Sequence, residues 1–568
     1  DAVENNTALK LPAGHATLSS NDGLSLQASG NFAGRYMRTY VGEGGTYLRT
    51  YVSNRFGVTV ASAKVVDTRI AELRASDLLL TPKAMGRTQI AYRDTSNKFG
   101  IIELEVLAKS SDVAVPMVVA GGYHTMALKA DGTVWAWGTN SNGQLGTGNT
   151  TNYYYPVPVV KGNQPGTSDY LSNVKQIAAG VEFSAALTNS GEVYVWGRND
   201  SGQLANATTQ GRQITPAKVP NLSGVLSIEA GYYNMFAIMS DGTVKAWGYN
   251  NVGQLGIGNS ATQRTPNTVK AGASGTGDLS DIIQIAAARH HTLALKANGS
   301  VFAFGSGQWG QLGNGVYSEA TGVYHNVVLD AKVYNTPIQV LKGAQTTSKS
   351  GYLENVVELA AAGGYGEVRT QQISSARTVY KYTGTSLAVT EDGTVYGWGD
   401  SHYGALGNRN KRNPNPIRVS TGAIGISVGG VGNSEIKGSP DFPYEDLYEK
   451  HTNGSYIYTQ VLKKDGTIET RGYNAQGQLG NGSQTNSNST KASGLSGMTY
   501  VASSVNGYHQ AAVKADGSVW TWGLNSSGQL GNGTYKGDGD NAERTTPLQG
   551  GGSSGNAMKL RQGALLDE

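Results

Sequence analysis

The sequence predicts an all-β protein whose larger part is one unit repeated around a ring. Three observations lead to this prediction. A pattern of strand, Asp-Gly turn, strand and glycine-rich bend, first seen over Val118–Asn149, recurs to the C-terminus. A small residue recurs at one position of the strand before the turn, which indicates crowded inner strands. Glycine accounts for 79 of 568 residues, as expected of a turn-rich β protein.

Each unit carries three landmarks that have a physical reason. A two-residue turn, usually Asp-Gly, lies between apolar runs, which is the strongest short hairpin signal because such a turn needs positive φ. Tryptophan precedes the glycine that closes the second strand, except for Phe304 in unit four and Arg471 in unit six. A Gly-Gln-Leu-Gly bend or a variant follows, and we interpret its leucine as a plug between neighbouring sheets. The closing glycines are Gly138, Gly197, Gly248, Gly305, Gly399, Gly472 and Gly523.

These residues resemble the repeats of the regulator of chromosome condensation family, whose fold is a seven-bladed β-propeller. The resemblance covers residues 118–549. It implies a closed ring in which Thr545–Gln549 completes the seventh unit beside the first. Radial repetition of this kind also protects sheet edges from aggregation.

The remaining segments predict two further parts. Residues 1–113 lack the repeat, and their short alternating runs with turn signals indicate a β-sandwich. Within them, Gly86–Lys109 resembles the last hairpin of bacterial immunoglobulin-like domains. The expected organisation is therefore an N-terminal immunoglobulin-like β-sandwich (1–113), a seven-bladed β-propeller (114–550) and a flexible Gly/Ser-rich tail (551–568).

Composition excludes several classes of function. The net charge is +4 and only 15% of residues are charged, so the sequence lacks the excess of basic residues that is typical of nucleic-acid binding. No apolar run approaches the ~20 residues that span a bilayer, so we expect no membrane insertion. Cysteine is absent, and no catalytic, phosphate-binding or metal-binding motif occurs, so we expect neither cofactor nor metal. The missing cysteine and the start at Asp1 lead us to expect an exported bacterial protein, extracellular or at the cell surface.

One candidate binding site lies in two near-copied segments, Tyr36–Val41 and Tyr47–Val52, around a Gly-Glu-Gly-Gly turn. A symmetric hairpin would set like charges opposite each other, which is destabilising. One interpretation is an exposed face where arginine stacks on tyrosine. The other is a docking strip for an acidic or aromatic partner, either another subunit or a ligand. The strip residues are Tyr36, Arg38, Tyr40, Tyr47, Arg49 and Tyr51.

A second candidate lies in two insertions, residues 364–383 and 431–455, at the same place in units five and six. Their equal position predicts that they lie on one face, on adjoining blades. They either pack on each other as a cap or form a recognition patch of tyrosine and arginine, residue types that dominate interfaces. The candidate residues are Tyr365, Arg369, Arg377, Tyr380, Tyr382, Phe442, Tyr444 and Tyr448.

These features predict a non-catalytic, exported or cell-surface scaffold for protein–protein interaction, with a self-assembling or filament-associated subunit as one form of it. Its partner would be another protein or copies of itself. The first alternative is a surface adhesin or carbohydrate-binding module that uses exposed tyrosines. The second is a secreted enzyme inhibitor, or an enzyme with its site on the propeller axis, which converging carboxylates in a deep axial pocket would favour.

Overall fold

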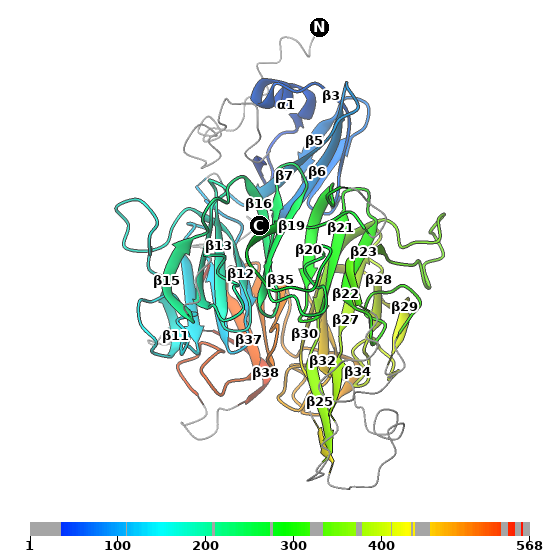
Figure 1. Ribbon diagram of the computed structural model, residues 1–568. Coiled ribbons are helices and arrows are strands. Elements are labelled where there is room, and N and C mark those ends of the chain that lie inside the picture. Colours follow the sequence, from blue (N-terminus) through cyan, green and yellow to red (C-terminus); the bar gives the residue numbers. More distant parts are fainter. Residues whose placement is uncertain are drawn as a thin grey trace.

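The computed structural model describes residues 36–109, 111–206, 211–272, 277–317, 333–370, 378–410, 412–432, 435–437, 455–535, 543–550 and 558–560. Within these residues the chain is strands and turns with a single α-helix, α1 (Leu48–Phe56), which confirms the all-β prediction. Figure 1 shows the sheets of residues 117–549 gathered in one body, with the N-terminal strands at one end.

Residues 117–549 form seven four-stranded sheets in sequence order. Sheet one holds β8 (Met117–Ala120), β9 (His124–Leu128), β10 (Val134–Gly138) and β11 (Tyr153–Pro158). Sheet two holds β12 (Val174–Ala179), β13 (Phe183–Thr188), β14 (Val193–Arg198) and β15 (Arg212–Lys218). Sheet three holds β16 (Val225–Ala230), β17 (Asn234–Met239), β18 (Val244–Gly248) and β19 (Gln263–Thr268). Sheet four holds β20 (Ile282–Ala287), β21 (His291–Lys296), β22 (Val301–Ser306) and β23 (Val333–Gln339).

The last three sheets follow the same plan. Sheet five holds β24 (Val356–Ala362), β27 (Thr385–Thr390), β28 (Val395–Gly399) and β29 (Asn413–Ser420). Sheet six holds β30 (Ala423–Val431), β32 (Tyr456–Lys463), β33 (Ile468–Gly472) and β34 (Ser487–Lys491). Sheet seven holds β35 (Met498–Ser503), β36 (His509–Lys514), β37 (Val519–Leu524) and β38 (Glu543–Gln549).

The repeated landmarks shape each sheet as the sequence predicts. At the first turn, the backbone N–H of Thr133 donates to Asp131 Oδ1 at 2.9 Å, and Gly132 takes φ 81°. Gly138 takes φ 106°, and a Cβ there would lie 2.5 Å from the carbonyl oxygen of Tyr123. Only glycine therefore fits the close approach of these two segments.

The sheets are joined in a ring by their first strands and by the repeated tryptophans. Each first strand contacts the next, and β35 contacts β8. Trp196 Nε1 donates to the carbonyl oxygen of Gln144, in the bend of the preceding sheet, at 2.9 Å. Trp137 makes the same bond to Gln529 of sheet seven, also at 2.9 Å, so the first and last sheets meet as the others do. All seven bend leucines are buried between sheets, as predicted.

Sheet six departs from this pattern at Arg471. Its side chain is buried, pairs with Glu469, and donates to the carbonyl oxygen of Val419 at 3.2 Å. Thr459 Oγ1 donates to Ala405 O at 2.8 Å, the carbonyl that corresponds to the tryptophan acceptor elsewhere. An internal ion pair therefore occupies the place of the indole.

Within the predicted flexible tail (551–568), residues 558–560 are held against the ring, and the rest of the tail lies outside the described residues. Met558 and Leu560 are buried against Val118 and Val519. The backbone N–H of Ala130 in sheet one donates to Leu560 O, and the N–H of Leu560 donates to Gly517 O in sheet seven, both at 2.8 Å. Three residues thus bridge the first and last sheets, because two apolar side chains fill the space between them.

The N-terminal strands form two small sheets. They do not establish the predicted immunoglobulin-like β-sandwich. One has the order β1 (Tyr36–Tyr40), β7 (Phe99–Leu107), β6 (Gly86–Asp94), β3 (Val60–Val65). The other has the order β2 (Thr46–Tyr47), β5 (Leu79–Pro82), β4 (Ala71–Arg74). We call residues 36–107 the N-terminal unit; residues 1–35 lie outside the described part of the chain.

The predicted symmetric hairpin over 36–52 is wrong. The first copy, β1, pairs in parallel with β7, and most of the second copy is α1. The helix buries Leu48, Tyr51 and Val52, a spacing of three and four residues, and ends at Gly57 in the left-handed conformation. Near-identical segments adopt different structures because each buries a different set of side chains against the same small core.

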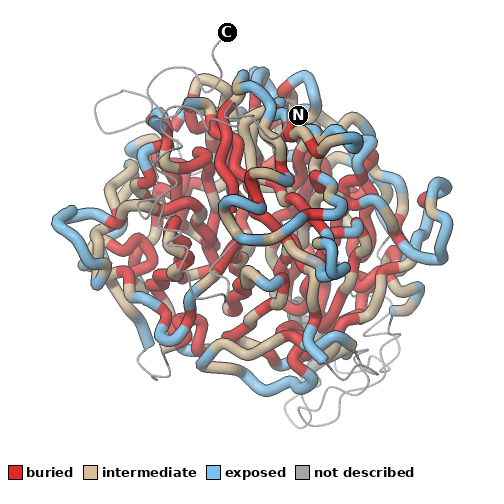
Figure 2. Tube along the Cα trace, turned by 90° about the horizontal axis from the view of Figure 1, so that it is seen from above, coloured by how far each residue is buried: buried red, intermediate tan, exposed pale blue. Residues whose placement is uncertain are grey.

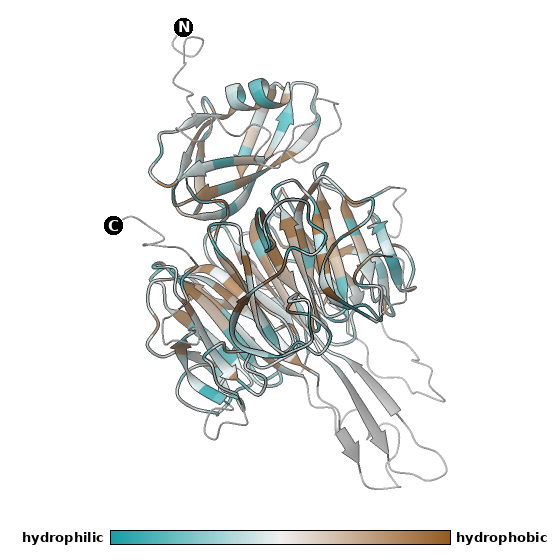
Figure 3. Cartoon of the chain, turned by 90° about the vertical axis from the view of Figure 1, so that its left-hand side faces the viewer, coloured by the Kyte–Doolittle hydropathy of each residue, from teal (hydrophilic) through white to brown (hydrophobic). Residues whose placement is uncertain are grey.

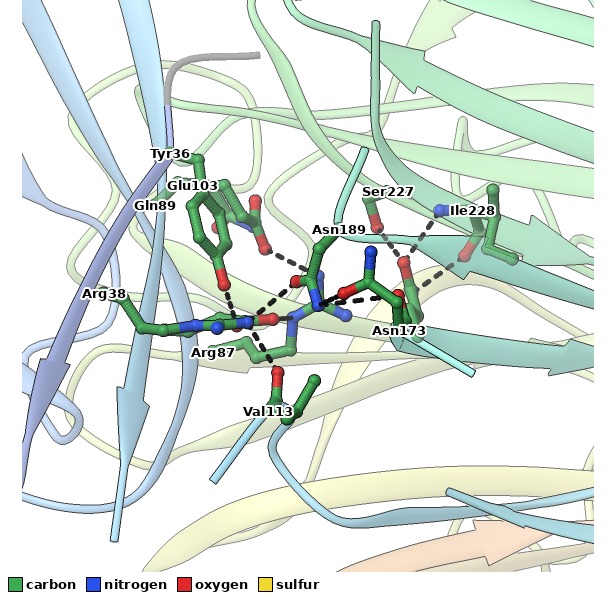
Figure 4. A network of polar contacts seen from close by, with 12 residues as sticks. Tyr36, Arg38, Arg87, Gln89, Glu103, Val113, Asn173, Asn189, Ser227 and Ile228 are labelled. Atoms are coloured by element: carbon green, nitrogen blue, oxygen red, sulfur yellow. Dashed lines mark hydrogen bonds and ion pairs between the residues drawn. The ribbon is translucent and has the colours of Figure 1, made fainter. Parts of the chain in front are cut away.

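The N-terminal unit is bound to the ring by a buried polar network (Figure 4). Arg38 donates to Glu105 at 3.0 Å, to the carbonyl oxygen of Val113 at 2.6 Å and to Asn189 Oδ1 in sheet two at 2.8 Å. Although burial raises the pKa of Glu105, the neighbouring arginines hold it below its ordinary value. Ile101 also packs into the apolar cluster of sheets four and five. Figure 2 shows buried segments throughout the interior and exposed ones mainly at the periphery.

Candidate protein-interaction face

The ring has two ends with different surfaces. Because neighbouring strands are antiparallel, the Asp-Gly turns lie at one end of each sheet, and the loops between first and second strands lie at the other. The N-terminal unit covers the turn end, through contacts such as Arg38 with Asn189. Figure 3 shows this unit on one side of the ring. The opposite end is rich in tyrosine, and we call it the tyrosine face. Its tyrosines are Tyr123, Tyr232, Tyr233, Tyr249, Tyr365, Tyr382, Tyr403, Tyr456, Tyr473 and Tyr508.

One half of the tyrosine face is organised around Arg289. Its guanidinium lies 4.0 Å from the ring centroid of Tyr232 and 4.8 Å from that of Tyr365, within the range of cation–π attraction. Among the described residues, Arg289 has no carboxylate partner, and its Nε is buried without a hydrogen bond. His290, beside it, packs against Tyr382 at 4.6 Å. This half therefore presents one uncompensated cation framed by aromatic rings.

The other half is a cluster of four tyrosines from sheets five, six and seven. The rings of Tyr456 and Tyr473 lie 4.4 Å apart, and Tyr403 lies 5.2 Å from Tyr473. Tyr508 extends the cluster at 5.9 Å from Tyr473. All four are partly exposed. Such amphipathic rings combine large contact area with a hydroxyl, which is why tyrosine is frequent in interfaces.

Burial keeps the phenols of this face protonated. It raises the pKa of Tyr123, Tyr249 and Tyr473, with neighbouring phenols adding to the effect at Tyr473. The pKa of Tyr508 is also raised, first by burial and then by the adjacent tyrosines. These phenols therefore stay protonated to a higher pH than an exposed tyrosine does.

The two insertions of units five and six lie side by side at this face, as predicted. β25 (Tyr365–Thr370) pairs antiparallel with β26 (Thr378–Tyr382) and in parallel with β31 (Glu435–Lys437). Figure 1 shows β25 at the end of the ring away from the N-terminal unit. The insertions therefore share a small sheet, which agrees with the interpretation that they pack on each other.

The structure brings some of the predicted binding residues together and separates others. Tyr365 and Tyr382 belong to the tyrosine face, with ring centroids 5.9 Å apart. Arg369 lies on β25 and Tyr380 on β26. The remaining predicted residues of the insertions lie outside the described residues: Arg377, Phe442, Tyr444 and Tyr448.

The proposed strip in the N-terminal unit is not a continuous exposed surface. Tyr36, Arg38 and Tyr40 are buried, and Arg38 contacts the chain's own ring. Arg49 is exposed on α1 and donates to the carbonyl oxygen of Val60 at 3.3 Å, while Tyr47 is half-buried and Tyr51 is buried. The charged and aromatic residues of this segment make a contact within the chain. An alternating sequence pattern alone does not distinguish such a contact from one with another protein.

Most of the tyrosine face was missed by the sequence prediction. Tyr123, Tyr233 and Tyr508 each stand directly before the first residue of a second strand, and Tyr249 and Tyr473 each follow a closing glycine. Recurrence of tyrosine at these two positions was the available signal. These positions lie next to the structural landmarks of the repeat and are not among them.

With this geometry in view, comparison with known proteins gives a clear result. Residues 83–434 match the RCC1-like domain, and residues 516–559 match the regulator of chromosome condensation (RCC1) repeat. The chain belongs to the RCC1-like domain family. The match supports the propeller of four-stranded blades, and it gives no support to an immunoglobulin-like domain.

The similar proteins are eukaryotic, and the predicted bacterial origin finds no support among them. The ultraviolet-B receptor UVR8 of Arabidopsis thaliana is 26% identical over 335 residues, which are 58% of this chain and 63% of the receptor. The human E3 ubiquitin-protein ligase HERC2 is 25% identical over 418 residues, which are 72% of this chain and 7% of the ligase. The chain therefore spans less than two thirds of either protein.

Two solved structures share the fold. Human WBSCR16 superposes with a TM-score of 0.51 and 18% identity, over 74% of this chain and 94% of its own. Yeast RCC1 (Prp20), bound to Kap60, superposes with a TM-score of 0.52 and 20% identity, over 75% of this chain and 86% of its own. At such identity the likeness concerns the fold alone.

No described helix is long and apolar enough to cross a membrane.

Proposed function

We propose that this RCC1-like chain is a non-catalytic protein-interaction or regulatory module that binds a protein partner through its tyrosine face. The seven sheets are interpreted as the blades of one closed seven-bladed propeller, which holds the face rigid. The observation that supports this proposal most is the set of tyrosines, most of them partly exposed, that flank Arg289 and pack around Tyr473 at the end opposite the N-terminal unit.

The similar proteins support the proposal at the level of class. Yeast RCC1 (Prp20) has been solved bound to Kap60, and the crystal structure of Prp20p from Saccharomyces cerevisiae is described with its binding properties to Gsp1p and histones. Each of these is a protein. Location outside the cell, self-assembly and carbohydrate binding stay predictions from the sequence.

A double variant tests the proposal. Arg289→Ala with Tyr473→Ala changes both halves of the face, and both side chains are only partly buried. Tyr170→Ala with Tyr352→Ala is the matched control, because these tyrosines are 47% and 40% exposed and lie in connections at the opposite end.

The measurement is cross-linking of the full chain in extract of its source cells, with the partner then purified and its Kd determined. We expect the face variant to weaken binding at least about tenfold, since interface tyrosine and arginine commonly contribute more than 1 kcal/mol each. Cross-links that map to the N-terminal unit, or equal loss in the control variant, would reject the proposal. Binding to a glycan array through the same residues would replace the protein partner with a carbohydrate.

A further inference from the structure

A cavity of about 320 Å³ lies on the ring axis. The first strands of all seven sheets line it, from β8 through β35. This volume is near the lower end of the roughly 300–1,000 Å³ typical of small-molecule sites. Because side chains alternate along a strand, each first strand sends every second residue toward the axis. The cavity is thus built from stacked layers of seven side chains.

One layer contains a single charged residue, Glu229. The pairing of first with second strands sets Ile228 opposite Ala237, as Ile177 is opposite Ala186, so Glu229 occupies the position of Ala178. The other sheets carry uncharged residues at this position: Val119, Ala178, Ala286, Ala360, Ser427 and Ala502. Small neighbours leave room around the carboxyl group.

Glu229 has no ion-pair partner among the described residues. Glu229 is partly exposed to the cavity, and a carboxylate that is withdrawn from bulk water without a counter-charge is costly. Burial accordingly raises the pKa of Glu229 to about 8, although the backbone N–H of Ala287 opposes this shift. Tyr500 lines the same cavity and is close enough for Glu229 to raise its pKa, second to burial. A raised carboxyl pKa in a cavity is a common sign of a functional site.

The chain itself supplies a cation to the neighbouring layer. Arg69 of the N-terminal unit lies 3.7 Å from Glu358 and donates to the carbonyl oxygen of Ala423 at 3.0 Å. Burial raises the pKa of Glu358 to about 7, while Arg69 acts to lower it. Asp67 holds Arg69 in place with a bond of 2.7 Å. One axial carboxylate therefore has an internal guanidinium, and the next one has none.

We propose that the axial cavity binds a small ligand with a primary ammonium group, with the Glu229 carboxylate as counter-charge and Tyr500 as an aromatic wall. A carboxylate beside an aromatic ring is the chemistry that recognises ammonium. A divalent metal would need several carboxylate or imidazole ligands, and no group of three such residues occurs in the described part of the chain. This site is independent of the tyrosine face.

The test is isothermal titration calorimetry of the full chain with propylammonium chloride. We expect binding with release of close to one proton at pH 7, since Glu229 must ionise; titration in phosphate and in HEPES, which differ in ionisation enthalpy, measures that proton. Affinity should rise about tenfold per pH unit below pH 8 and level off above it. Other ionisable groups also face this region: Glu358, Tyr500, Arg69, Asp67 and Arg87. The binding of propylammonium to the Glu358→Gln variant is therefore measured in the same way.

Glu229→Gln keeps the side-chain volume and should weaken binding at least about tenfold and abolish the proton release. Glu354→Gln, at a partly exposed residue that does not line the cavity, is the matched control and should bind as the original chain does. Near-ultraviolet circular dichroism checks that each variant is folded. The proposal is overturned if propylammonium does not bind, if propanol binds as well, if Glu229→Gln binds unchanged, or if Ca²⁺ or Mg²⁺ binds in its place.

Discussion

Lys175 shows how single residues join the two parts of this chain. It is fully buried, its ammonium lies 4.6 Å from the ring centroid of Tyr36, and its Nζ has no hydrogen bond among the described residues. Burial, followed by Arg87, lowers its pKa from 10.5 to about 8, against the opposing charges of Glu105 and Glu103. Folding therefore destabilises the charged form of the Lys175 side chain relative to its neutral form.

The sign of the resulting pH dependence follows from proton binding. Between pH 8 and 10.5 the unfolded chain holds the proton of Lys175 and the folded chain does not, so stability rises with pH in this window. At pH 7 the cost amounts to at most about 3 kcal/mol, at about 1.4 kcal/mol per unit of pKa. Lys175→Met should be more stable than the original chain at pH 7 and lack the rise.

Urea unfolding at pH 7 and pH 10 measures this effect. The exposed Lys464→Met is the control and should follow the original chain at both pH values. If Lys175→Met shows the same rise with pH as the original chain, another group is responsible.

The strands of the two paired insertions lie outside the seven four-stranded sheets of the ring. β25, β26 and β31 form a sheet of their own, apart from the seven four-stranded sheets. Tyr365 and Tyr382 are directly paired, so two residues can join them in a tight turn. The hairpin can thus be removed without taking a strand from any four-stranded sheet.

Replacing residues 366–381 by Asn-Gly should leave the thermal midpoint within about 2 °C, because surface changes away from packed features alter stability little. Partner binding should weaken at least about tenfold if the insertions form part of the interaction face. Circular dichroism and the Kd for the purified partner measure the two effects, with Tyr352→Ala as a control. A large fall in the midpoint would instead make the hairpin a structural cap.

At the scale of the whole molecule, the ring depends on the contact between its ends. All four strands of the first sheet precede all four of the last in sequence, so no strand of one sheet belongs to the other. The closure relies on Trp137 with Gln529 and on residues 558–560 between the two sheets. This segment is therefore part of the fold.

Leu560→Ala should lower the free energy of unfolding by about 2–5 kcal/mol, the usual cost of this change at a buried site. Lys559→Ala, one residue away and exposed, should change it by less than about 0.5 kcal/mol. Denaturant unfolding of both variants provides the comparison. Equal stability of the two variants would show that the ring closes without the tail.

The repeated sheet can be predicted from local sequence, because turn geometry, close backbone approach and the buried bend leucine are local requirements that recur in the same order in every unit. It also placed the two insertions on one face. Tertiary structure decided the rest. Tyr36–Val41 and Tyr47–Val52 are nearly the same sequence, yet one is a strand against β7 and the other a helix, since burial against distant residues outweighs local preference. The tyrosine face and the axial cavity that holds Glu229 and Glu358 likewise arise only when seven sheets bring single positions together.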